Sequence, residues 1–259
     1  MNDAIRPAPA APLDRTKFST IAHTEHRLLS PIDPGRLDRL FALLELGPND
    51  LALDVGCGKA EMLIRLIERF GVRAVGVDLN TTFLGEARIE AEARGVADRL
   101  VLHPARFDDV PLPTGHFALA IASGAGAAFG GYRETLRALG KLVRPGGLLV
   151  IGEGHWKREP DPDYLAVLGG TRDESEDLHG NVAAAEAEGL IPLYVCVSSD
   201  QDWDHYEGLY ARAIERYAAA HPEDPDRDRM LERIRNWRDA YFRWGRDTLG
   251  FALYLLRKP

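Results

Sequence analysis

The sequence predicts an α/β fold built on a doubly wound, mostly parallel sheet. Between Leu51 and Ile151, short apolar runs alternate with longer segments that carry apolar residues at helical spacing. Strands that alternate with helices form parallel sheets covered on both faces, and right-handed crossovers wind such a sheet in both directions. A glycine-rich turn after the first strand is a second indication, because these sheets bind ligands at the carboxyl ends of their strands.

The elements of this central stretch follow from the apolar spacing and from helix-ending residues. The expected strands are Leu51–Val55, Arg73–Val77, Leu100–Leu102, Phe117–Ala122 and Leu148–Ile151. The expected helices are Ala60–Phe70, Thr81–Arg94 and Tyr132–Val143. Gly95 and the Pro145-Gly146-Gly147 turn end two of these helices, because glycine adopts the left-handed conformation that closes a helix and proline cannot continue one.

The segments on either side are less regular. Residues 1–35 are expected to form a flexible tail and an N-terminal helical arm, and residues 36–259 the main domain. Within that domain we expect an amphipathic helix at Arg36–Leu46, a loop or short helical connection at 159–177, a helix at Asn181–Glu188, a strand at Leu190–Ser198, a helical insertion at 203–247 and a last strand at Phe251–Leu256. One apolar seam runs along the second half of the insertion, formed by Met230, Ile234, Trp237, Tyr241 and Trp244. Such a seam is more often internal packing than a pocket, and the alternatives are that it covers the substrate site or forms a dimer contact. The chain is expected to be a monomer or a homodimer.

Composition excludes several classes of protein. Of the 259 residues, 40 are acidic and 32 are Lys or Arg, which gives a net charge of −8. A general nucleic-acid binder needs a basic surface, so no nucleic-acid partner is expected. The two cysteines, Cys57 and Cys196, provide neither a disulfide framework nor a CxxC pair, so no metal is expected. No stretch reaches the roughly 18 uncharged apolar residues of a membrane span, so we expect a cytoplasmic protein without membrane contact.

A glycine-rich turn follows the first strand. Gly56 and Gly58 leave room for a ligand to approach the backbone. Asp78 ends the next strand, 20 residues after Gly58. That is about the spacing at which an acidic residue reaches a ribose hydroxyl in nucleotide-binding folds. A glycine turn without a ligand is the structural alternative, and the presence of Asp54 and Asp78 at two strand ends argues against it.

Two kinds of ligand compete for this turn. A dinucleotide needs a third glycine where this chain has Glu61, and Glu61 and Asp54 would repel its pyrophosphate. A cationic ligand that has a ribose but no phosphate fits better. S-adenosylmethionine carries a sulfonium, an ammonium and two ribose hydroxyls, so Asp54 suits its methionine end and Asp78 its ribose.

Four stretches of the chain resemble the class I S-adenosylmethionine-dependent methyltransferases. LDVGCGKAE resembles the first motif of that family, with Ala60 in place of the third glycine, and GVDLN resembles the acidic second motif. LVRPGGLLVIGE and the closing GFALYLLRK resemble the family's fifth and last strands. The resemblance implies a Rossmann-like sheet of seven strands whose last strand is antiparallel. It also implies S-adenosylmethionine as the cofactor and S-adenosylhomocysteine as the product.

The resemblance further implies which residues bind the cofactor. They are Asp54, Gly56, Cys57, Gly58, Asp78, Leu79, Arg106, Phe107 and Ser123. Many members bind the adenine amino group with an acidic residue after the third strand, where this chain reads HPARF. The backbone of Arg106 or Phe107, or stacking on the Phe107 ring, is therefore expected to hold the adenine.

The methyl acceptor is expected to be a small molecule. After the fourth strand the chain reads ASGA, and it lacks the [DN]PP[FY] sequence of enzymes that methylate amino groups of adenine or glutamine. No Pro-Cys pair offers a nucleophile for cytosine. Two alternatives remain open: a cofactor-binding or regulatory protein of the same fold without catalysis, and a methyltransferase of proteins or RNA. The second would use the Arg-rich stretch Arg227–Arg246 as a basic rim.

Candidates for catalysis and acceptor binding lie beyond the strand ends. Glu153 and His155 are expected to be catalytic if the acceptor must lose a proton. The residues expected to bind the substrate are Trp156, Trp203, Tyr206 and His23. His23 belongs to the N-terminal segment, which is expected to close over the cofactor.

Overall fold

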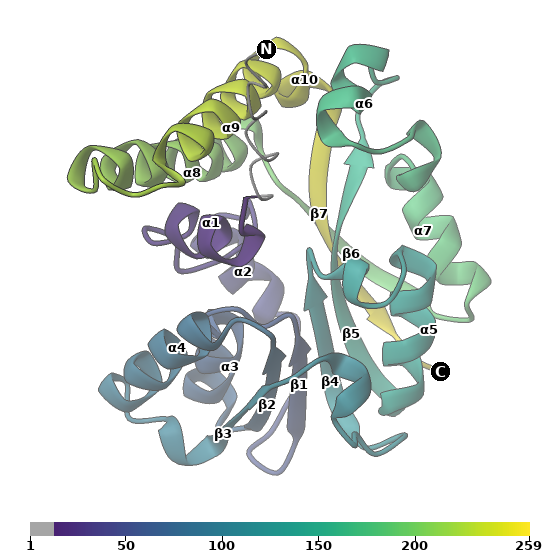
Figure 1. Cartoon of the computed structure of the whole chain (residues 1–259). Helices are drawn as coiled ribbons and strands as arrows, with labels where there is room; N and C mark the ends of the chain where they lie inside the picture. Colours follow the sequence, from purple (N-terminus) through teal and green to yellow (C-terminus); the bar gives the residue numbers. More distant parts are fainter. Residues whose placement is uncertain (1–12) are drawn as a thin grey trace, which may run out of the picture.

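The central sheet of the computed structural model has the predicted doubly wound architecture (Figure 1). The structure describes residues 13–259, and within them the sheet has seven strands in the order β3-β2-β1-β4-β5-β7-β6. Their bounds are β1 Leu51–Val55, β2 Arg73–Asp78, β3 Leu100–Pro104, β4 Phe117–Ser123, β5 Val143–Trp156, β6 Ile191–Val197 and β7 Leu249–Arg257. β7 pairs antiparallel with β5 and β6, and the other neighbouring strands are parallel, which confirms the predicted fold class. The order reverses between β1 and β4, so a ligand site is expected at their carboxyl ends.

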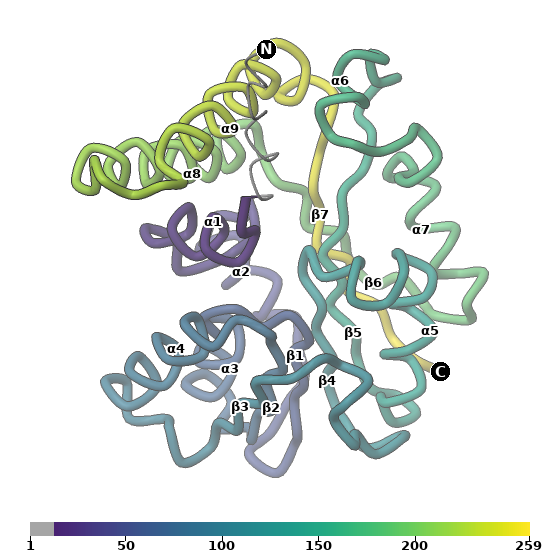
Figure 2. Tube along the Cα trace, in the orientation of Figure 1, coloured from purple at the N-terminus to yellow at the C-terminus, as the bar shows by residue number. Residues whose placement is uncertain are grey.

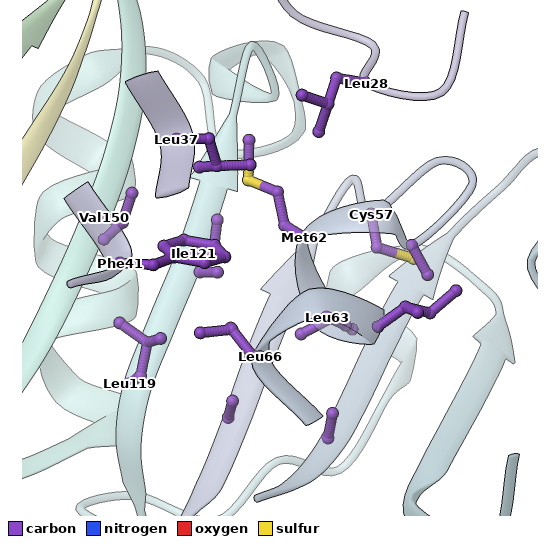
Figure 3. Close-up of a cluster of buried hydrophobic side chains, with 14 of the residues drawn as sticks. Leu28, Leu37, Phe41, Cys57, Met62, Leu63, Leu66, Leu119, Ile121 and Val150 are labelled. Carbon is purple, nitrogen blue, oxygen red and sulfur yellow. The ribbon is translucent and has the colours of Figure 1, made fainter. Parts of the chain in front are cut away.

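Helices cover both faces of the sheet. On one face lie α2 (Pro34–Phe41), α3 (Glu61–Phe70) and α4 (Thr81–Ala93), and on the other lie α5 (Tyr132–Leu142) and α7 (Leu178–Ala187). Figure 3 shows the core on the first face, where Leu66 of α3 and Phe41 of α2 pack against Ile121 of β4. This packing fixes the start of α3, and with it the glycine turn that precedes the helix.

The fifth strand is longer than the sequence predicts. The sequence places Glu153, His155 and Trp156 beyond the strand end, whereas β5 continues through all three residues. The reason is tertiary, because β7 pairs with β5 antiparallel as far as Trp156. Glu153 and His155 therefore share one face of a paired strand and Trp156 points to the other, and none of the three is free in a loop.

The predicted insertion consists of two long helices, α8 (Asp200–Ala220) and α9 (Arg227–Ala240). A π-helical turn at Tyr241–Gly245 and the short α10 (Arg246–Thr248) lead from α9 into β7. The insertion begins three residues earlier than predicted, because Ser199 caps α8 in a capping box with Asp202. Between β5 and α7 the chain forms α6 (Pro162–Leu168), in agreement with the expected short helical connection.

The N-terminal arm lies between the insertion and the sheet, as Figures 1 and 2 show. Its helix α1 (Arg15–Ala22) buries Phe18 against Ile214 of α8 and Ile234 of α9. Part of the insertion's apolar seam is thus covered by the arm of the same chain. The flexible tail predicted at the start of segment 1–35 covers residues 1–13, of which residues 1–12 lie outside the described residues. Within residues 13–259, no helix combines the length and the apolar character needed to cross a bilayer.

Candidate functional site

The turn between β1 and α3 brings the backbone close to neighbouring segments. Gly56 and Gly58 have positive φ angles of 74° and 52°, which glycine adopts without strain. A Cβ atom on Gly56 would lie 2.6 Å from the Cβ atom of Ala125, and one on Gly58 would collide with Leu29. The turn therefore lies directly against the loop after β4 and against the N-terminal arm, without room for side chains at either glycine.

Glu61, at the start of α3, does not behave as the sequence suggests. Its carboxylate is buried and forms ion pairs of 2.6 Å with Arg65 and 2.8 Å with Arg94. The expected repulsion of a pyrophosphate by Glu61 is therefore wrong, because two guanidinium groups neutralise this carboxylate. The electrostatic preference of the turn rests instead on Asp54 and Asp78.

Asp54 is a buried carboxylate without a cation. Its side chain is 4% exposed at the end of β1, and its Oδ1 atom has no hydrogen-bond partner among the described residues. Burial, with a further contribution from the charge of Asp78, raises the pKa of Asp54 to about 8. Burying an ionised carboxylate is costly unless a cation pairs with it. A positively charged ligand group next to Asp54 would therefore be bound favourably.

Asp78 closes the other side of the turn. Its Oδ2 atom accepts a hydrogen bond of 2.8 Å from the backbone N–H of Gly58, and Oδ1 accepts one of 2.7 Å from Asn80. These two bonds fix the carboxylate at the ends of β1 and β2. A carboxylate held in this way still has free lone pairs that can accept hydrogen bonds from hydroxyl groups.

A cavity of about 340 Å³ opens next to these groups. Five of the predicted cofactor-binding residues line it, namely Gly56, Asp78, Leu79, Arg106 and Phe107. The Leu79 side chain is 65% exposed, and the Phe107 ring lies 4.7 Å from that of Phe129. A cavity with apolar walls and a few fixed polar groups is typical of a small-molecule or cofactor site.

The arm is tied to this site by hydrogen bonds that the sequence analysis did not anticipate. They join Asn80 Nδ2 to Thr20 Oγ1 (2.8 Å), Lys59 Nζ to the carbonyl of His23 (2.9 Å), and the hydroxyls of Ser30 and Ser123 (2.7 Å). Ser123 therefore contacts the arm and not the 340 Å³ cavity. The sequence holds one signal for Asn80, since it follows Asp78 closely and precedes a helix, but none for Thr20 or Ser30.

His23 and Tyr206 brace the arm against the insertion. His23 Nδ1 lies 2.8 Å from the carbonyl of Ser19, so this nitrogen carries the proton, and Nε2 accepts from the Tyr206 hydroxyl at 2.9 Å. Burial lowers the pKa of His23 to about 4, so the ring is neutral at pH 7. Both residues lie at the arm and outside the lining of the 340 Å³ cavity.

Glu153 is the predicted catalytic residue that the structure places nearest to this site. Its Oε2 atom lies 3.1 Å from the position of a Cβ atom on Gly126, in the same loop whose Ala127 and Ala128 line the cavity. Burial raises the pKa of Glu153, although a hydrogen bond from Gly154 acts in the opposite direction. A carboxyl group with a raised pKa can exchange a proton with a ligand near neutral pH.

The other predicted residues lie elsewhere. His155 is 1% exposed and packs against Gly250 of β7, and burial lowers its pKa to about 4. Trp156 is buried beside Tyr164 and donates a hydrogen bond of 2.9 Å to the carbonyl of Arg172. The Cys57 thiol is buried, and burial raises its pKa, so only the Cys57 backbone contributes to the turn. Trp203 lines a different and smaller cavity.

Comparison with known proteins agrees with this geometry. A family model described as a methyltransferase domain matches residues 52–147. The uncharacterized protein YjhP of Escherichia coli K12 is 25% identical, with 94% of this chain and 99% of that protein covered. The 27-O-demethylrifamycin SV methyltransferase of Amycolatopsis mediterranei is 26% identical, with 86% and 82% covered. A methyltransferase structure from Geobacter sulfurreducens in complex with S-adenosylhomocysteine has a TM-score of 0.88 and 26% identity, with 94% and 98% covered.

The fold, the glycine turn with its two carboxylates and these similarities define an α/β methyltransferase. The chain carries a methyltransferase domain and is similar over most of its length to S-adenosylmethionine-dependent methyltransferases of class I, and S-adenosylmethionine is its cofactor. The resemblance found in the sequence is confirmed.

Proposed function

We propose that this methyltransferase transfers the methyl group of S-adenosylmethionine to a small-molecule acceptor. The observation that carries the proposal is the Asp54 carboxyl group, which is buried without a hydrogen-bond partner for Oδ1 among the described residues. Asp54 directly precedes Val55 and Gly56, which line a cavity together with Asp78 and Phe107. The methionine end of the cofactor is positively charged, so it suits this uncompensated carboxylate. The residues present therefore fit the cofactor.

Different parts of the cofactor are assigned to different residues of the turn and the cavity. Asp54 binds the cationic methionine end, and the Asp78 carboxylate accepts hydrogen bonds from the ribose hydroxyls. Leu79 and Phe107 supply apolar surface for the adenine, together with the backbone of Arg106. The backbone of the turn meets the cofactor at Gly56, which lines the cavity. Ser123 holds the arm in place through Ser30.

Catalysis by this chain requires alignment, exclusion of water and, for some acceptors, a base. When bound, the cofactor supplies a methyl group that its sulfonium has already activated for displacement. Glu153 is assigned the role of base, because its raised pKa and its place next to the loop after β4 suit it to take a proton from the acceptor. His155 is buried against Gly250 of β7 and does not reach the cavity. It is therefore assigned a positioning role, in which it holds β5 against β7.

Closure of the site is assigned to the arm. Thr20, His23 and Ser30 connect it to the second strand, the glycine turn and the fourth strand. Tyr206 supports the arm from the insertion side. Ordered contacts on both sides would keep water out during transfer.

Two observations support a small molecule as the acceptor. The net charge of −8 disfavours a polyanionic acceptor such as RNA. The relative named for 27-O-demethylrifamycin SV matches 86% of this chain, so its similarity extends beyond the cofactor-binding half.

Two measurements test the proposal. Calorimetry with S-adenosylhomocysteine measures cofactor binding, and absence of binding at about millimolar ligand would overturn the proposal. Incubation with methyl-labelled S-adenosylmethionine and a metabolite extract then measures transfer, and label is expected in a low-molecular-weight product. Cofactor binding without any label transfer would favour the alternative of a binding or regulatory protein, and label in protein or RNA would contradict the small-molecule acceptor.

A further inference from the structure

A second, separate cavity lies where the insertion meets the end of the sheet. Its volume is about 10 Å³, which is roughly the space that one water molecule needs. Four of its eight lining residues are aromatic: Tyr164, Trp203, Trp237 and Tyr241. They come from α6, α8, α9 and the π-helical turn, so the cavity forms only when these elements pack together.

Glu207 is the one charged residue among the described residues that line this cavity. Its side chain is 8% exposed and accepts a hydrogen bond of 2.6 Å from Trp237 Nε1. Burial raises the pKa of Glu207 to about 7, and the hydrogen bond from Trp237 acts in the opposite direction. No cation among the described residues contributes to this pKa. A buried carboxylate that has one hydrogen bond and no counter-charge is destabilising unless a proton or a cation joins it.

The surroundings of Glu207 favour an organic cation over a metal ion. Trp203 and Tyr241 lie with ring centroids 6.4 Å apart and planes inclined by 26°, and the cavity touches both. Aromatic faces attract ammonium groups, with about 2 kcal/mol or more in a dehydrated site. Metal ions such as Mg²⁺ and Ca²⁺ need about six or more oxygen ligands, and the described part of the chain contributes a single carboxylate, Glu207, to this lining.

The cavity lies at the carboxyl end of β5, near the strand ends at which the methyl acceptor is expected to bind. Leu249, which lines the cavity, is the first residue of β7 and pairs with Trp156 at the carboxyl end of β5. Trp203, in another wall, also packs against the core cluster that contains Phe251. The cavity therefore lies beyond the carboxyl end of β5, the edge at which ligands of doubly wound sheets bind.

We propose that this cavity binds the ammonium group of an organic amine through the Glu207 carboxylate and the surrounding aromatic rings. A primary ammonium group is about as large as water and fits the volume. On the basis of the proposed function, this amine is the methyl acceptor. Its ammonium nitrogen has no lone pair and only anchors the ligand at Glu207, while a nucleophilic atom in the remaining part, toward the end of β5, forms the new bond to the methyl group. The sulfur–methyl bond of the cofactor breaks, S-adenosylhomocysteine leaves, and a proton of the acceptor atom passes to the proposed base Glu153. Trp203 Nε1 is buried and has no hydrogen-bond partner within residues 13–259, so it can donate a hydrogen bond to an oxygen of the same ligand.

The test measures amine binding without methyl transfer. Methylammonium chloride is titrated into the full-length protein at a pH above 8, where Glu207 is ionised, and the fluorescence of the tryptophans reports binding. Methanol, which is of similar size but neutral, is the reference ligand. We expect methylammonium to bind, and Glu207→Gln to weaken its binding by at least about tenfold, because the charge and its desolvated contact are lost. The matched control Glu232→Gln, at an exposed position on α9, should bind as the unmodified protein does.

Each result decides the proposal. Methylammonium binding no stronger than methanol binding would overturn it, and so would equal binding by Glu207→Gln and the unmodified protein. Glu207 would then be a protonated structural carboxyl beside a buried water. The comparison of methylammonium with methanol uses the unmodified protein, so it tests the proposed amine site even if Glu207→Gln does not fold. A parallel calorimetric titration with S-adenosylhomocysteine separates the two proposals, since its failure would overturn the proposed function and leave the amine site in force.

Discussion

The side-chain amide of Asn80 donates a hydrogen bond of 2.8 Å to the hydroxyl of Thr20, although the two residues lie 60 positions apart. The same side chain starts α4, because its Oδ1 atom accepts hydrogen bonds from the backbone N–H groups of Thr82 and Phe83. One residue thus joins the strand end that carries Asp78 to the N-terminal arm. Cofactor binding and the order of the arm are therefore expected to depend on each other.

Loss of the Thr20 hydroxyl tests this dependence. We expect Thr20→Val to weaken binding of S-adenosylhomocysteine by about fivefold, since one hydrogen bond is worth about 1 kcal/mol. Hydrogen exchange of residues 15–30 should become faster in the same variant. Thr16→Val changes an exposed threonine of the same helix and should alter neither quantity. Unchanged exchange in Thr20→Val would show that the other contacts suffice to hold the arm.

Replacement of Asp54 by asparagine tests the electrostatic role of this carboxylate. Asp54→Asn keeps the shape of the side chain but removes its negative charge. Binding of S-adenosylmethionine should weaken by more than about tenfold, because a charge-assisted contact is lost. The ligand-free protein should at the same time melt at a higher temperature at pH 8, because no charge is then buried. A variant that binds the cofactor normally would refute the role assigned to Asp54.

The pKa of Asp54 also predicts a dependence of stability on pH. The pKa is about 8 in the fold against 3.8 for an ordinary aspartate, so the folded state holds this proton more tightly than the unfolded state does. The contribution of this group to stability is therefore complete below about pH 4 and is lost as the pH rises toward about 8. Melting curves recorded across this range should show a decline that is smaller in Asp54→Asn. Parallel curves for the two proteins would contradict the raised pKa.

The proton on the Asp54 carboxyl group also affects cofactor binding. A cationic ligand favours ionised Asp54, so below pH 8 its binding must release the proton. The affinity for S-adenosylmethionine should rise between pH 6 and pH 8 by up to about tenfold per pH unit. The same titration with Asp54→Asn provides the baseline for groups on the ligand itself. An equal pH dependence in both proteins would assign the effect to the ligand.

Asp78 tests the predicted ribose contact. Asp78→Ala should weaken binding of S-adenosylhomocysteine by well over about tenfold, because it removes charge-assisted hydrogen bonds. It also removes the acceptor for the backbone N–H of Gly58. Asp98→Ala, at an exposed position after α4, is the matched control and should leave the affinity unchanged. Calorimetry measures both, and an unchanged affinity in Asp78→Ala would refute the assignment.

Glu153 tests the proposed base. Once an acceptor is known, Glu153→Gln should lower kcat by about 100-fold or more while the affinity for S-adenosylhomocysteine is unchanged. The rate of the unmodified enzyme should fall as the pH drops below the raised pKa of Glu153, and this dependence should be absent in the variant. Glu159→Gln, an exposed change beyond the end of β5, is the control. Equal kcat values would show that the acceptor needs no base.

Local sequence determined the cofactor half of the molecule. The alternation of apolar runs predicted the strands and helices of a doubly wound sheet, because the periods of 2.0 and 3.6 residues can be recognised in the sequence itself. Gly56, Gly58 and Asp78 lie at the tight turn and the strand end that the sequence predicts, because these features at fixed spacing leave a local signature. The electrostatic argument from Glu61 was wrong, since nothing local indicates that Arg94 reaches it from the end of α4.

The acceptor half was decided by tertiary structure. Glu153 and His155 belong to β5 and not to a loop, because a strand from the other end of the chain pairs with them. Thr20 and Ser30 reach the site only because α1 packs on the insertion. The burial of Glu207 among aromatic rings likewise requires α6, α8 and α9 to meet. Periodicity and turn residues are local properties, whereas burial and ion pairing depend on contacts between distant segments, and only the folded chain brings those segments together.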